Sequence, residues 1–394
     1  MKMWVYITRR CMLVVPVILG VMTITFALVA LLPIQDKLLA YYGPSKIGYD
    51  PQILCTQIGI EQPGTCPNPA YLRGVHQLGL DQPIWTQWAH YMVNSLTLNW
   101  GFTDAGSFAS RSIGFTNGAT VATALSYFLP YTVELAAFSL VLTLVISIPL
   151  GNLSAAHRNR PIDQAARVMS FSGFALPSFL LALLLIFVAI GIQGPDIHCS
   201  GTAFSFTDWY GSWPPLTCFS NDRLPSWIGA YQQTSPTGFP TVDALVHGDY
   251  FLAADSLRRM LLPAIVIAYG TIAGILRFVR NSMLEVMNLD FIRTARAKGV
   301  PERTVIGHHA GRNSLNVTVT VLGLTFAGFV SGFPIIEYVF NLRGVGLLLA
   351  YSIQRPFDYG LIFGSTLLFT LVIVFVNLVV DILYAYLDPR VRLG

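Results

Sequence analysis

Long apolar segments alternate with polar segments along the whole chain. Crossing the hydrocarbon core of a membrane takes about 20 apolar helical residues, with a usual range of about 17–25. Six segments meet this requirement, and we predict a membrane-spanning helix in each: Met12–Leu32, Tyr131–Leu150, Met169–Ile192, Met260–Leu276, Leu315–Ile336 and Gly360–Leu383. The pattern therefore predicts an all-α, polytopic membrane protein with six transmembrane helices.

Composition agrees with this pattern. Hydrophobic residues make up 54% of the 394 residues and charged residues only 11%, and the mean hydropathy is +0.58. A soluble globular domain usually carries about 25% charged residues. The first apolar segment is too long, and too weakly followed by a cleavage signal, for a removable signal peptide.

The distribution of basic residues predicts the orientation in the membrane. If the N-terminus lies inside, the short inner segments hold most of the 24 Lys and Arg residues and few acids. Short cytoplasmic loops are typically enriched in Lys and Arg. We therefore expect both termini to be cytoplasmic. Because topology accounts for the basic residues, nothing in the sequence indicates nucleic-acid binding.

The predicted spans and orientation give a linear organisation. Two long polar stretches fall outside the membrane, and both exceed the usual length of a connection between helices. We predict a cytoplasmic N-terminus with the first helix (1–33), an extracytoplasmic loop (34–130), the second and third helices (131–192), an extracytoplasmic insertion (193–259), and the fourth to sixth helices (260–394) with a cytoplasmic loop at 283–314.

Within the last cytoplasmic loop, Asp290–Ser314 is a basic segment between two apolar runs. The segment contains two acidic residues, Asp290 and Glu302. It contains five basic residues: Arg293, Arg296, Lys298, Arg303 and Arg312. Alanines favour a helix around the first charges, and Gly299 and Pro301 then interrupt it. Such a knob suits docking to a partner, although an ordinary positive-inside loop has the same charge.

Several motifs resemble the dipeptide/oligopeptide permease family of ABC importers. The run from Arg293 to Gly299, R-T-A-R-A-K-G, resembles the EAA loop of these permeases. The other matching segments are Arg9-Arg10 before the first apolar run, L-G-L-D-Q-P-I at 78–84, E-Y-V-F-N-L-R-G-V-G at 337–346, and the tail N-L-V-V-D-I-L-Y at 377–384 with L-D-P-R at 387–390. Departures are Gly311 in place of a Leu, a missing Pro after it, and the size of the second outer loop.

This resemblance implies a type I ABC-importer permease fold in a prokaryotic plasma (inner) membrane. It implies a complex with a second homologous permease subunit, two ABC ATPase subunits and an extracytoplasmic substrate-binding protein. The sequence contains no G-x-x-x-x-G-K-[ST] phosphate loop, so ATP and Mg are expected on the partner subunits, with no cofactor bound directly. The chain would be a non-catalytic transport subunit that forms half of the translocation pathway by alternating access.

The resemblance also assigns roles to particular residues. The cytoplasmic loop would be the coupling helix, with small residues at the ATPase contact and charges at its rim: Arg293, Ala295, Arg296, Lys298 and Gly299. The segment after the fifth predicted span would belong to the outer gate, through Glu337, Phe340, Gly344 and Gly346. An exposed turn after a helix is the simpler interpretation of that second segment.

Charged and polar residues inside the predicted spans are further candidates. Glu134 and Asp381 carry the charges within those limits, and buried charge in a membrane is costly, which makes each a candidate for a pore role. Both also lie near a membrane interface, where such a residue serves architecture. Asn377 is as suited to a hydrogen bond between helices as to a substrate contact. Pro177 and several glycines are candidates for kinks.

Cysteine placement predicts disulfides on the outer side. Cys55 and Cys66 lie in the first outer loop, and Cys199 and Cys218 in the second. An even number of cysteines on the oxidising side favours disulfides over a metal site, and local pairing is the simplest of three connectivities. Cys11 is expected as a free, buried thiol. His308 and His309 are adjacent and would point in different directions, so no metal site is expected there.

Other functions stay open at this stage. The same machinery imports oligosaccharides or a metal chelate in some relatives of the family. A self-contained secondary transporter or channel would not need the cytoplasmic loop. An intramembrane enzyme would need a Ser/His or paired-Asp site, whereas the predicted spans contain no His and a single Asp. Import of di-/oligopeptides is the function that the motifs favour.

Overall fold

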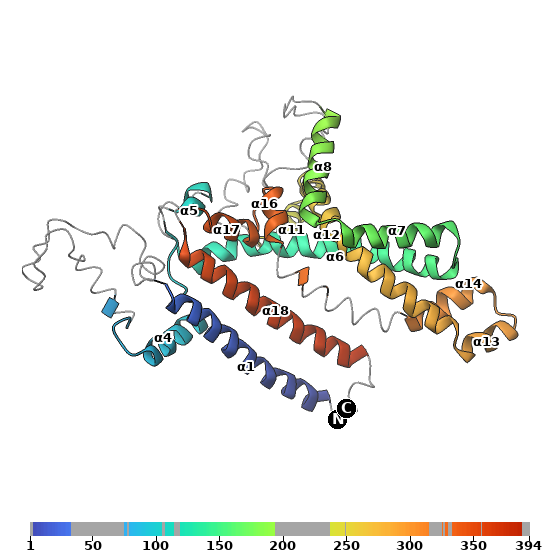
Figure 1. Ribbon diagram of the computed structural model, residues 1–394, viewed down its shortest axis with the longest axis horizontal. Helices are drawn as coiled ribbons and strands as arrows, with labels where there is room; N and C mark the ends of the chain where they lie inside the picture. The colour runs from blue at the N-terminus through green and yellow to red at the C-terminus, as the bar shows by residue number, and fades with distance from the viewer. Residues whose placement is uncertain are drawn as a thin grey trace, which may run out of the picture. The chain divides into compact units, whose positions relative to one another are not determined.

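The computed structural model describes residues 3–32, 75–76, 79–104, 107–113, 119–193, 237–248, 250–314, 325, 328–329, 333–355 and 357–387. Within these residues the structure is helical (Figure 1), apart from an isolated antiparallel bridge between Phe102 and Thr120. The all-α prediction is confirmed for this part of the chain. The four cysteines of the predicted outer loops and most of Leu315–Ile336 lie outside the described residues.

Four helices in the described ranges are long and apolar enough to cross a membrane. They are α1 (Met3–Ala30), α6 (Val121–Ala156), α12 (Tyr250–Met287) and α18 (Tyr359–Leu387). A bent pair, α7 (Pro161–Ala175) and α8 (Ser178–Gln193), provides a fifth span if it is counted as one. Apolar side chains are exposed along α1 and α8, as expected for helices that meet lipid.

The predicted third span, Met169–Ile192, is two helices rather than one. Helix α7 ends at Ala175, α8 begins at Ser178, and their directions differ by 105°. Leu176 has an extended backbone, with φ −93° and ψ 116°. A residue before proline is pushed out of the α region, so Pro177 accounts for the break.

Two other helices begin earlier than the hydropathy pattern predicted. Helix α6 begins at Val121 rather than Tyr131, and α12 at Tyr250 rather than Met260. Pro130 and Pro263 lie inside these helices. Proline removes one backbone hydrogen bond but is tolerated in membrane helices, so the chain continues through both positions.

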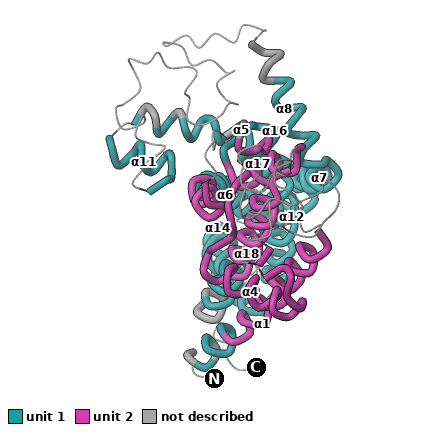
Figure 2. The backbone as a smooth tube through the Cα atoms, turned by 90° about the vertical axis from the view of Figure 1, so that its left-hand side faces the viewer, with its two compact units in different colours: residues 1–11, 130–343, 375–394 teal, residues 12–129, 344–374 magenta. Residues whose placement is uncertain are grey.

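The chain divides into two compact units (Figure 2). Unit 1 comprises residues 1–11, 130–343 and 375–394, and unit 2 comprises residues 12–129 and 344–374. Unit 1 contains α7, α8, α11 (Pro240–Val246), α12, α13 (Asp290–Ala297), α14 (Glu302–Thr304) and α16 (Pro334–Val339). Unit 2 contains α4 (Ile84–Leu96), α5 (Phe108–Ile113) and α17 (Val345–Ser352), and α1, α6 and α18 contribute to both units.

Unit 2 has an apolar core between the beginnings of α6 and α18. Its fully buried members include Val121, Leu125 and Leu361. Gly364 permits a close approach, because a Cβ there would lie 2.3 Å from Val121 Cγ1. At the edge of this core, buried Asp358 accepts hydrogen bonds from the Ser107 hydroxyl and from the backbone N–H groups of Asp104 and Leu361. Burial raises the pKa of Asp358 to about 6.

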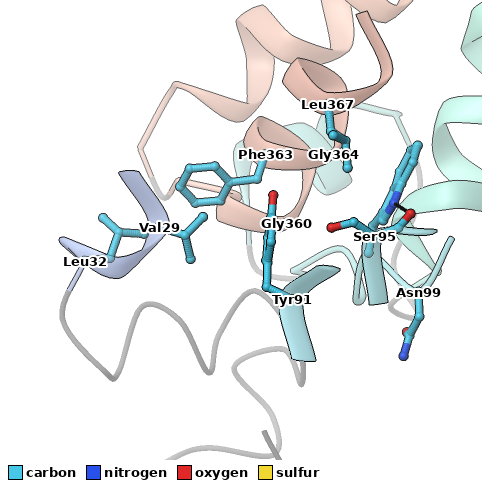
Figure 3. Close-up of a pocket in the computed structure, with 10 residues that line it drawn as sticks. Val29, Leu32, Tyr91, Ser95, Asn99, Gly360, Phe363, Gly364 and Leu367 are labelled. Atoms are coloured by element: carbon cyan, nitrogen blue, oxygen red, sulfur yellow. Dashed lines mark hydrogen bonds between the residues drawn. The ribbon is translucent and has the colours of Figure 1, made fainter. Parts of the chain in front are cut away.

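A small cavity lies among α1, α4 and α18 in the same unit (Figure 3). Its volume is about 30 Å³, and Val29, Tyr91, Ser95 and Phe363 line it. A water molecule needs about 10–15 Å³ of such space. The cavity therefore has room for water but is too small for a peptide.

Unit 1 is built around α12, which packs closely on α7 and α6. A Cβ on Gly173 would lie 2.5 Å from that of Ala273, and a Cβ on Gly151 would lie 2.7 Å from Val279. The hydroxyls of Ser172 and Tyr269 share a hydrogen bond of 2.7 Å across the same contact. These small residues bring the three helices together, as is typical of helix packing in membranes.

The exposure of Cys11 on α1 differs from the prediction. Cys11 is a free cysteine, as expected, but its side chain is exposed rather than buried. A residue of α1 that faces away from the neighbouring helices would contact lipid. Lipid provides an apolar environment, so burial against other protein groups is not needed there.

Candidate functional site

The segment after α12 folds as a short helix, a break and a second helical stretch, as predicted. Helix α13 is followed by Lys298–Pro301, by α14, and by a π-helical turn at Val305–Ala310. We call residues 283–314 the coupling module. Its own apolar core consists of buried Met283, Ile292, Val305 and Ala310 together with Ala155 of α6.

This core holds the coupling module to the end of α12. Ile292 is fully buried and Val305 and Ala310 close over it. Ser282, which directly precedes the module on α12, donates a hydrogen bond of 3.0 Å to the backbone carbonyl of Ser314 at the end of the module. Ala295 is half-buried against the same core, so only part of its surface is available to a partner.

Gly299 ends α13 in a Schellman motif. Its N–H donates to the Arg296 carbonyl at 3.0 Å, and the Val300 N–H donates to the Ala295 carbonyl at 3.2 Å. Its φ is +75°, in the left-handed region that glycine adopts without steric cost. No atom lies within 4 Å of a Cβ added there, so Gly299 is on an open surface.

The charges of the coupling module differ in how far they are already paired. Arg296 makes two hydrogen bonds to Glu302, at 2.6 and 3.2 Å, and this pairing lowers the pKa of Glu302 and raises that of Arg296. Arg293 lies 3.5 Å from Asp290 but its side chain is 74% exposed. Lys298 is exposed. Arg303 and Arg312 are exposed as well, so the positive surface of the module is carried by Arg293, Lys298, Arg303 and Arg312.

Two apolar side chains on this surface were missed by the sequence analysis. Leu289 and Phe291 are 49% and 41% exposed beside the buried Ile292. For Phe291 the signal was present in the sequence, since adjacent residues of a helix cannot both face one core. Leu289 is the N-cap of α13, and helix periodicity gave no signal for its exposure. The coupling module thus presents apolar and basic side chains together.

The predicted outer-gate residues are buried. Glu337 is 1% exposed and accepts a hydrogen bond of 3.0 Å from the Thr132 hydroxyl, which links α16 to α6. Phe340 is 2% exposed. Their burial disagrees with an exposed turn. Gly344 is the N-cap of α17 and Gly346 is buried within that helix, both in unit 2.

Two of the three polar residues predicted inside the spans contact another helix of unit 1. Glu134 accepts a hydrogen bond of 3.1 Å from the Thr241 N–H of α11. Asp381 forms an ion pair of 3.0 Å with Arg10, which joins the last helix to the first. Asn377 lies half-buried on α18, one turn before Asp381.

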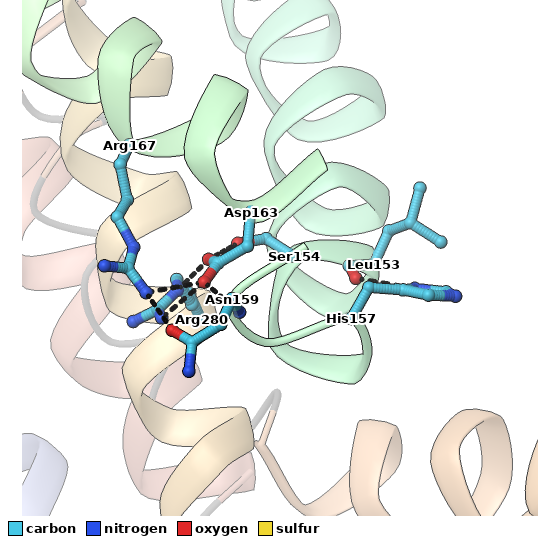
Figure 4. A network of polar contacts seen from close by, with 7 residues as sticks. All are labelled: Leu153, Ser154, His157, Asn159, Asp163, Arg167 and Arg280. Carbon is cyan, nitrogen blue, oxygen red and sulfur yellow. Dashed lines mark hydrogen bonds and ion pairs between the residues drawn. The ribbon is translucent and has the colours of Figure 1, made fainter. Parts of the chain in front are cut away.

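A buried ionic network was not predicted; it lies where the C-terminal parts of α6 and α12 meet the first turn of α7. Asp163 is fully buried and accepts hydrogen bonds from five donors (Figure 4). The donors are the Ser154 hydroxyl at 2.6 Å, the Asn159 N–H at 2.9 Å, Arg167 at 2.6 Å, and Arg280 at 2.7 and 3.1 Å. One carboxylate therefore connects three helices next to the coupling module.

Comparison with known proteins identifies the family. Residues 147–393 match the family described as "Binding-protein-dependent transport system inner membrane component". The chain belongs to this family, which confirms the resemblance seen in the motifs. It is therefore a multi-pass inner-membrane permease component of a transport system, not an enzyme.

Individual relatives match along their whole length. The chain is 32% identical to the probable D,D-dipeptide transport system permease protein of Escherichia coli (strain K12), over 100% of this chain and 99% of the relative. It is 30% identical to the dipeptide transport system permease protein of the same organism, over 98% of each chain. It is also 30% identical to the oligopeptide transport system permease protein of Bacillus subtilis (strain 168), over 98% of this chain and 99% of the relative.

Proposed function

We propose that this chain is one permease subunit of an ATP-driven importer of di-/oligopeptides. Full-length similarity to relatives named as dipeptide, D,D-dipeptide and oligopeptide permeases supports this substrate class. The observation that carries the proposal is the coupling module, because a compact surface that combines apolar and basic side chains at the end of α12 suits an external motor. Its partners are a second homologous permease, two ABC ATPase subunits and an extracytoplasmic substrate-binding protein.

The proposed topology has six transmembrane helices and cytoplasmic termini. The helices long enough to span within the described ranges account for four or five of them, and the apolar sequence of Leu315–Ile336 predicts another. Basic residues at 1–11, 157–167 and 277–314 support a cytoplasmic position for these segments. The coupling module then faces the ATPases.

Coupling requires a firm connection between the docking surface and the helices. Leu289, Phe291, Arg293 and Lys298 would contact an ATPase, with Gly299 leaving the approach open. The buried core around Ile292 attaches this surface to α12. The Asp163–Arg280 pair attaches α12 to α6 and α7. A push on the module, driven by ATP binding, would therefore move these helices as a group.

Two further assignments belong to the same proposal. Glu337 and Phe340, with Gly344 and Gly346, would act at the outer gate; the hydrogen bond from Thr132 to Glu337 would be one that rearranges when the path opens. Cys55 with Cys66, and Cys199 with Cys218, would form disulfides in the extracytoplasmic loops.

The test is co-purification of the tagged chain from its native membranes in mild detergent. We expect a second permease chain and ATPases with nucleotide-binding motifs to be recovered. Gly299→Trp should abolish recovery of the ATPases and retain the second permease, because the bulky ring would cover the docking surface.

Gly248→Trp is a matched control. Gly248 has a φ of +73°, and an added Cβ there also meets no atom within 4 Å. The backbone strain is therefore the same, but the residue follows α11 in the proposed outer segment. Retention of the ATPases by both Trp variants, or their loss from both, would contradict the assignment of the coupling surface.

A further inference from the structure

A second surface feature of unit 1 is a cavity beside the Asp163 network. It has a volume of about 480 Å³ and lies between α7 and α12, next to the turn at Arg158 and Asn159. Small-molecule sites typically have volumes of about 300–1,000 Å³. The cavity is therefore large enough for a ligand, and its lining includes no residue of α13 or of the turn at Gly299.

The lining of this cavity is strongly basic. Four of the side chains that line it are arginines: Arg158, Arg167, Arg277 and Arg280. Asp163 pairs with Arg167 and Arg280. Arg158 and Arg277 are exposed and have no ion-pair partner among the residues that the structure describes. Two guanidinium groups are thus left to meet an anion.

The same cavity has an apolar side. Phe171 and Phe174 line it and are 71% and 66% exposed. They follow Arg167 by four and seven residues on α7, so all three lie on one face of the helix. Phe174 approaches α12, since a Cβ on Gly274 would lie 3.6 Å from its Cζ. The cavity therefore changes from basic to aromatic along α7.

We propose that this cavity binds an anionic phospholipid. The phosphate of the headgroup would accept hydrogen bonds from Arg158 and Arg277, and an acyl chain would lie along Phe171 and Phe174. Arginine recognises phosphate through paired N–H groups, and basic pockets between membrane helices are suited to acidic headgroups. A free phosphate or a soluble anion would use the arginines but would leave the two rings exposed.

The bound phospholipid would also strengthen the connection between α12 and α7. An anion between Arg158 and Arg277 bridges the turn before α7 to α12, alongside the bridge made by Asp163. The inference depends on the proposed orientation only for the leaflet, because cytoplasmic placement means that the inner leaflet supplies the lipid. Binding and orientation are therefore separately measurable.

The experiment is native mass spectrometry of the full permease complex, released from detergent after titration with phosphatidylglycerol or phosphatidylcholine. The test variant is Arg158→Gln with Arg277→Gln. The control is Arg303→Gln with Arg312→Gln, which removes the same charge from exposed positions in the coupling module. We expect phosphatidylglycerol to bind in preference to phosphatidylcholine, and the test variant to bind it about thirtyfold more weakly.

A second comparison separates the lipid from a free anion. Phe171→Ala with Phe174→Ala should weaken phosphatidylglycerol binding and leave any binding of inorganic phosphate unchanged. Equal loss of lipid binding in the test and control variants would overturn the proposal, as would equal affinity for the two lipids. So would unchanged lipid binding accompanied by loss of a partner subunit, which would make this a protein contact.

Discussion

At the residue scale, Asp163 is the side chain whose loss should matter most for stability. It is fully buried, and Arg280, which pairs with it, is only 15% exposed. Asp163→Asn leaves that guanidinium without its counter-charge in the protein interior. Removing one partner of a buried pair typically costs about 3–5 kcal/mol. We expect a marked fall in the thermal midpoint of the detergent-purified complex, measured by intrinsic fluorescence.

Asp290→Asn is the control for this prediction. Asp290 is also paired with an arginine, but its side chain is 95% exposed. Exposed pairs contribute about 0–1 kcal/mol, so the midpoint should stay near that of the wild type. A similar small effect for both variants would mean that the Asp163 network adds little to the packing of α6, α7 and α12.

Asp358 predicts a dependence of stability on pH. Burial, with Asp104 nearby, raises its pKa to about 6 in the folded chain, against a usual value of 3.8. The folded state therefore binds more protons than the unfolded state between these pH values, and stability falls as pH rises from about 4 to about 6. Protonation of the Asp358 carboxyl thus adds about 3 kcal/mol to the free energy of unfolding below pH 4, relative to pH values above 6.

Comparison with Asp358→Asn isolates this group. The amide does not titrate, so the difference in unfolding midpoint between wild type and variant should shrink from pH 4 to pH 7. The variant also loses one of the acceptors that serve Asp104, Ser107 and Leu361, so it should be less stable at low pH. Parallel pH profiles would show that the Asp358 carboxyl is not perturbed in the folded protein.

At the scale of elements, different residues of the coupling module are expected to serve stability and docking. Ile292 is fully buried, whereas its neighbour Phe291 is 41% exposed. Ile292→Ala should destabilise the module by about 2–5 kcal/mol, since it leaves a cavity in the small core. Phe291→Ala should leave stability nearly unchanged and weaken retention of the ATPases. Limited proteolysis of the module and co-purification distinguish the two.

The reverse pattern would be informative. If Phe291→Ala exposed the module to protease while retention of the ATPases was unaffected, Phe291 would be a packing residue. Tyr338→Ala is a suitable control for a loss of exposed aromatic surface, because Tyr338 is 48% exposed on α16.

Hydropathy predicted the helices themselves but not their limits or their contacts. A window of apolar residues finds α1, α6, α12 and α18, because burial in lipid depends on composition. It cannot find the break at Pro177, where backbone sterics outweigh an unbroken apolar run. It also places the start of α6 after Pro130, although membrane helices accommodate proline.

The helix, break and second helical stretch of the coupling module could be predicted from the sequence because helix, glycine and proline signals are local. Its docking role is a prediction that comes from the family resemblance. The sequence could not show that Ala295 turns partly inward or that Phe291 turns outward, since this depends on which side of α13 meets α12. The Asp163–Arg280 pair joins residues 117 positions apart. Arg10 and Asp381 come from opposite ends of the chain. Pairing at such separations is a property of the packed helices.

At the scale of the whole molecule, the first prediction concerns topology. In a variant with all five cysteines replaced by Ser, single cysteines are introduced as Val246→Cys on α11 and Arg303→Cys in the coupling module. Both positions are exposed. A membrane-impermeant maleimide should label the first in intact spheroplasts and the second only after lysis. Labelling of both from outside would contradict the proposed orientation.

Transport itself tests how the parts work together. The permease pair and ATPases, reconstituted in liposomes with the binding protein, should accumulate a labelled dipeptide only when ATP is supplied. The permease pair alone should show no uptake, since the chain carries no phosphate loop. Gly299→Trp should reduce uptake to background, while Gly248→Trp, with the same backbone conformation, should support it. ATP-independent uptake by the pair would instead indicate a self-contained transporter. ATP-dependent uptake of an oligosaccharide or metal chelate in place of peptide would contradict the proposed substrate class but not the proposed coupling to the ATPases.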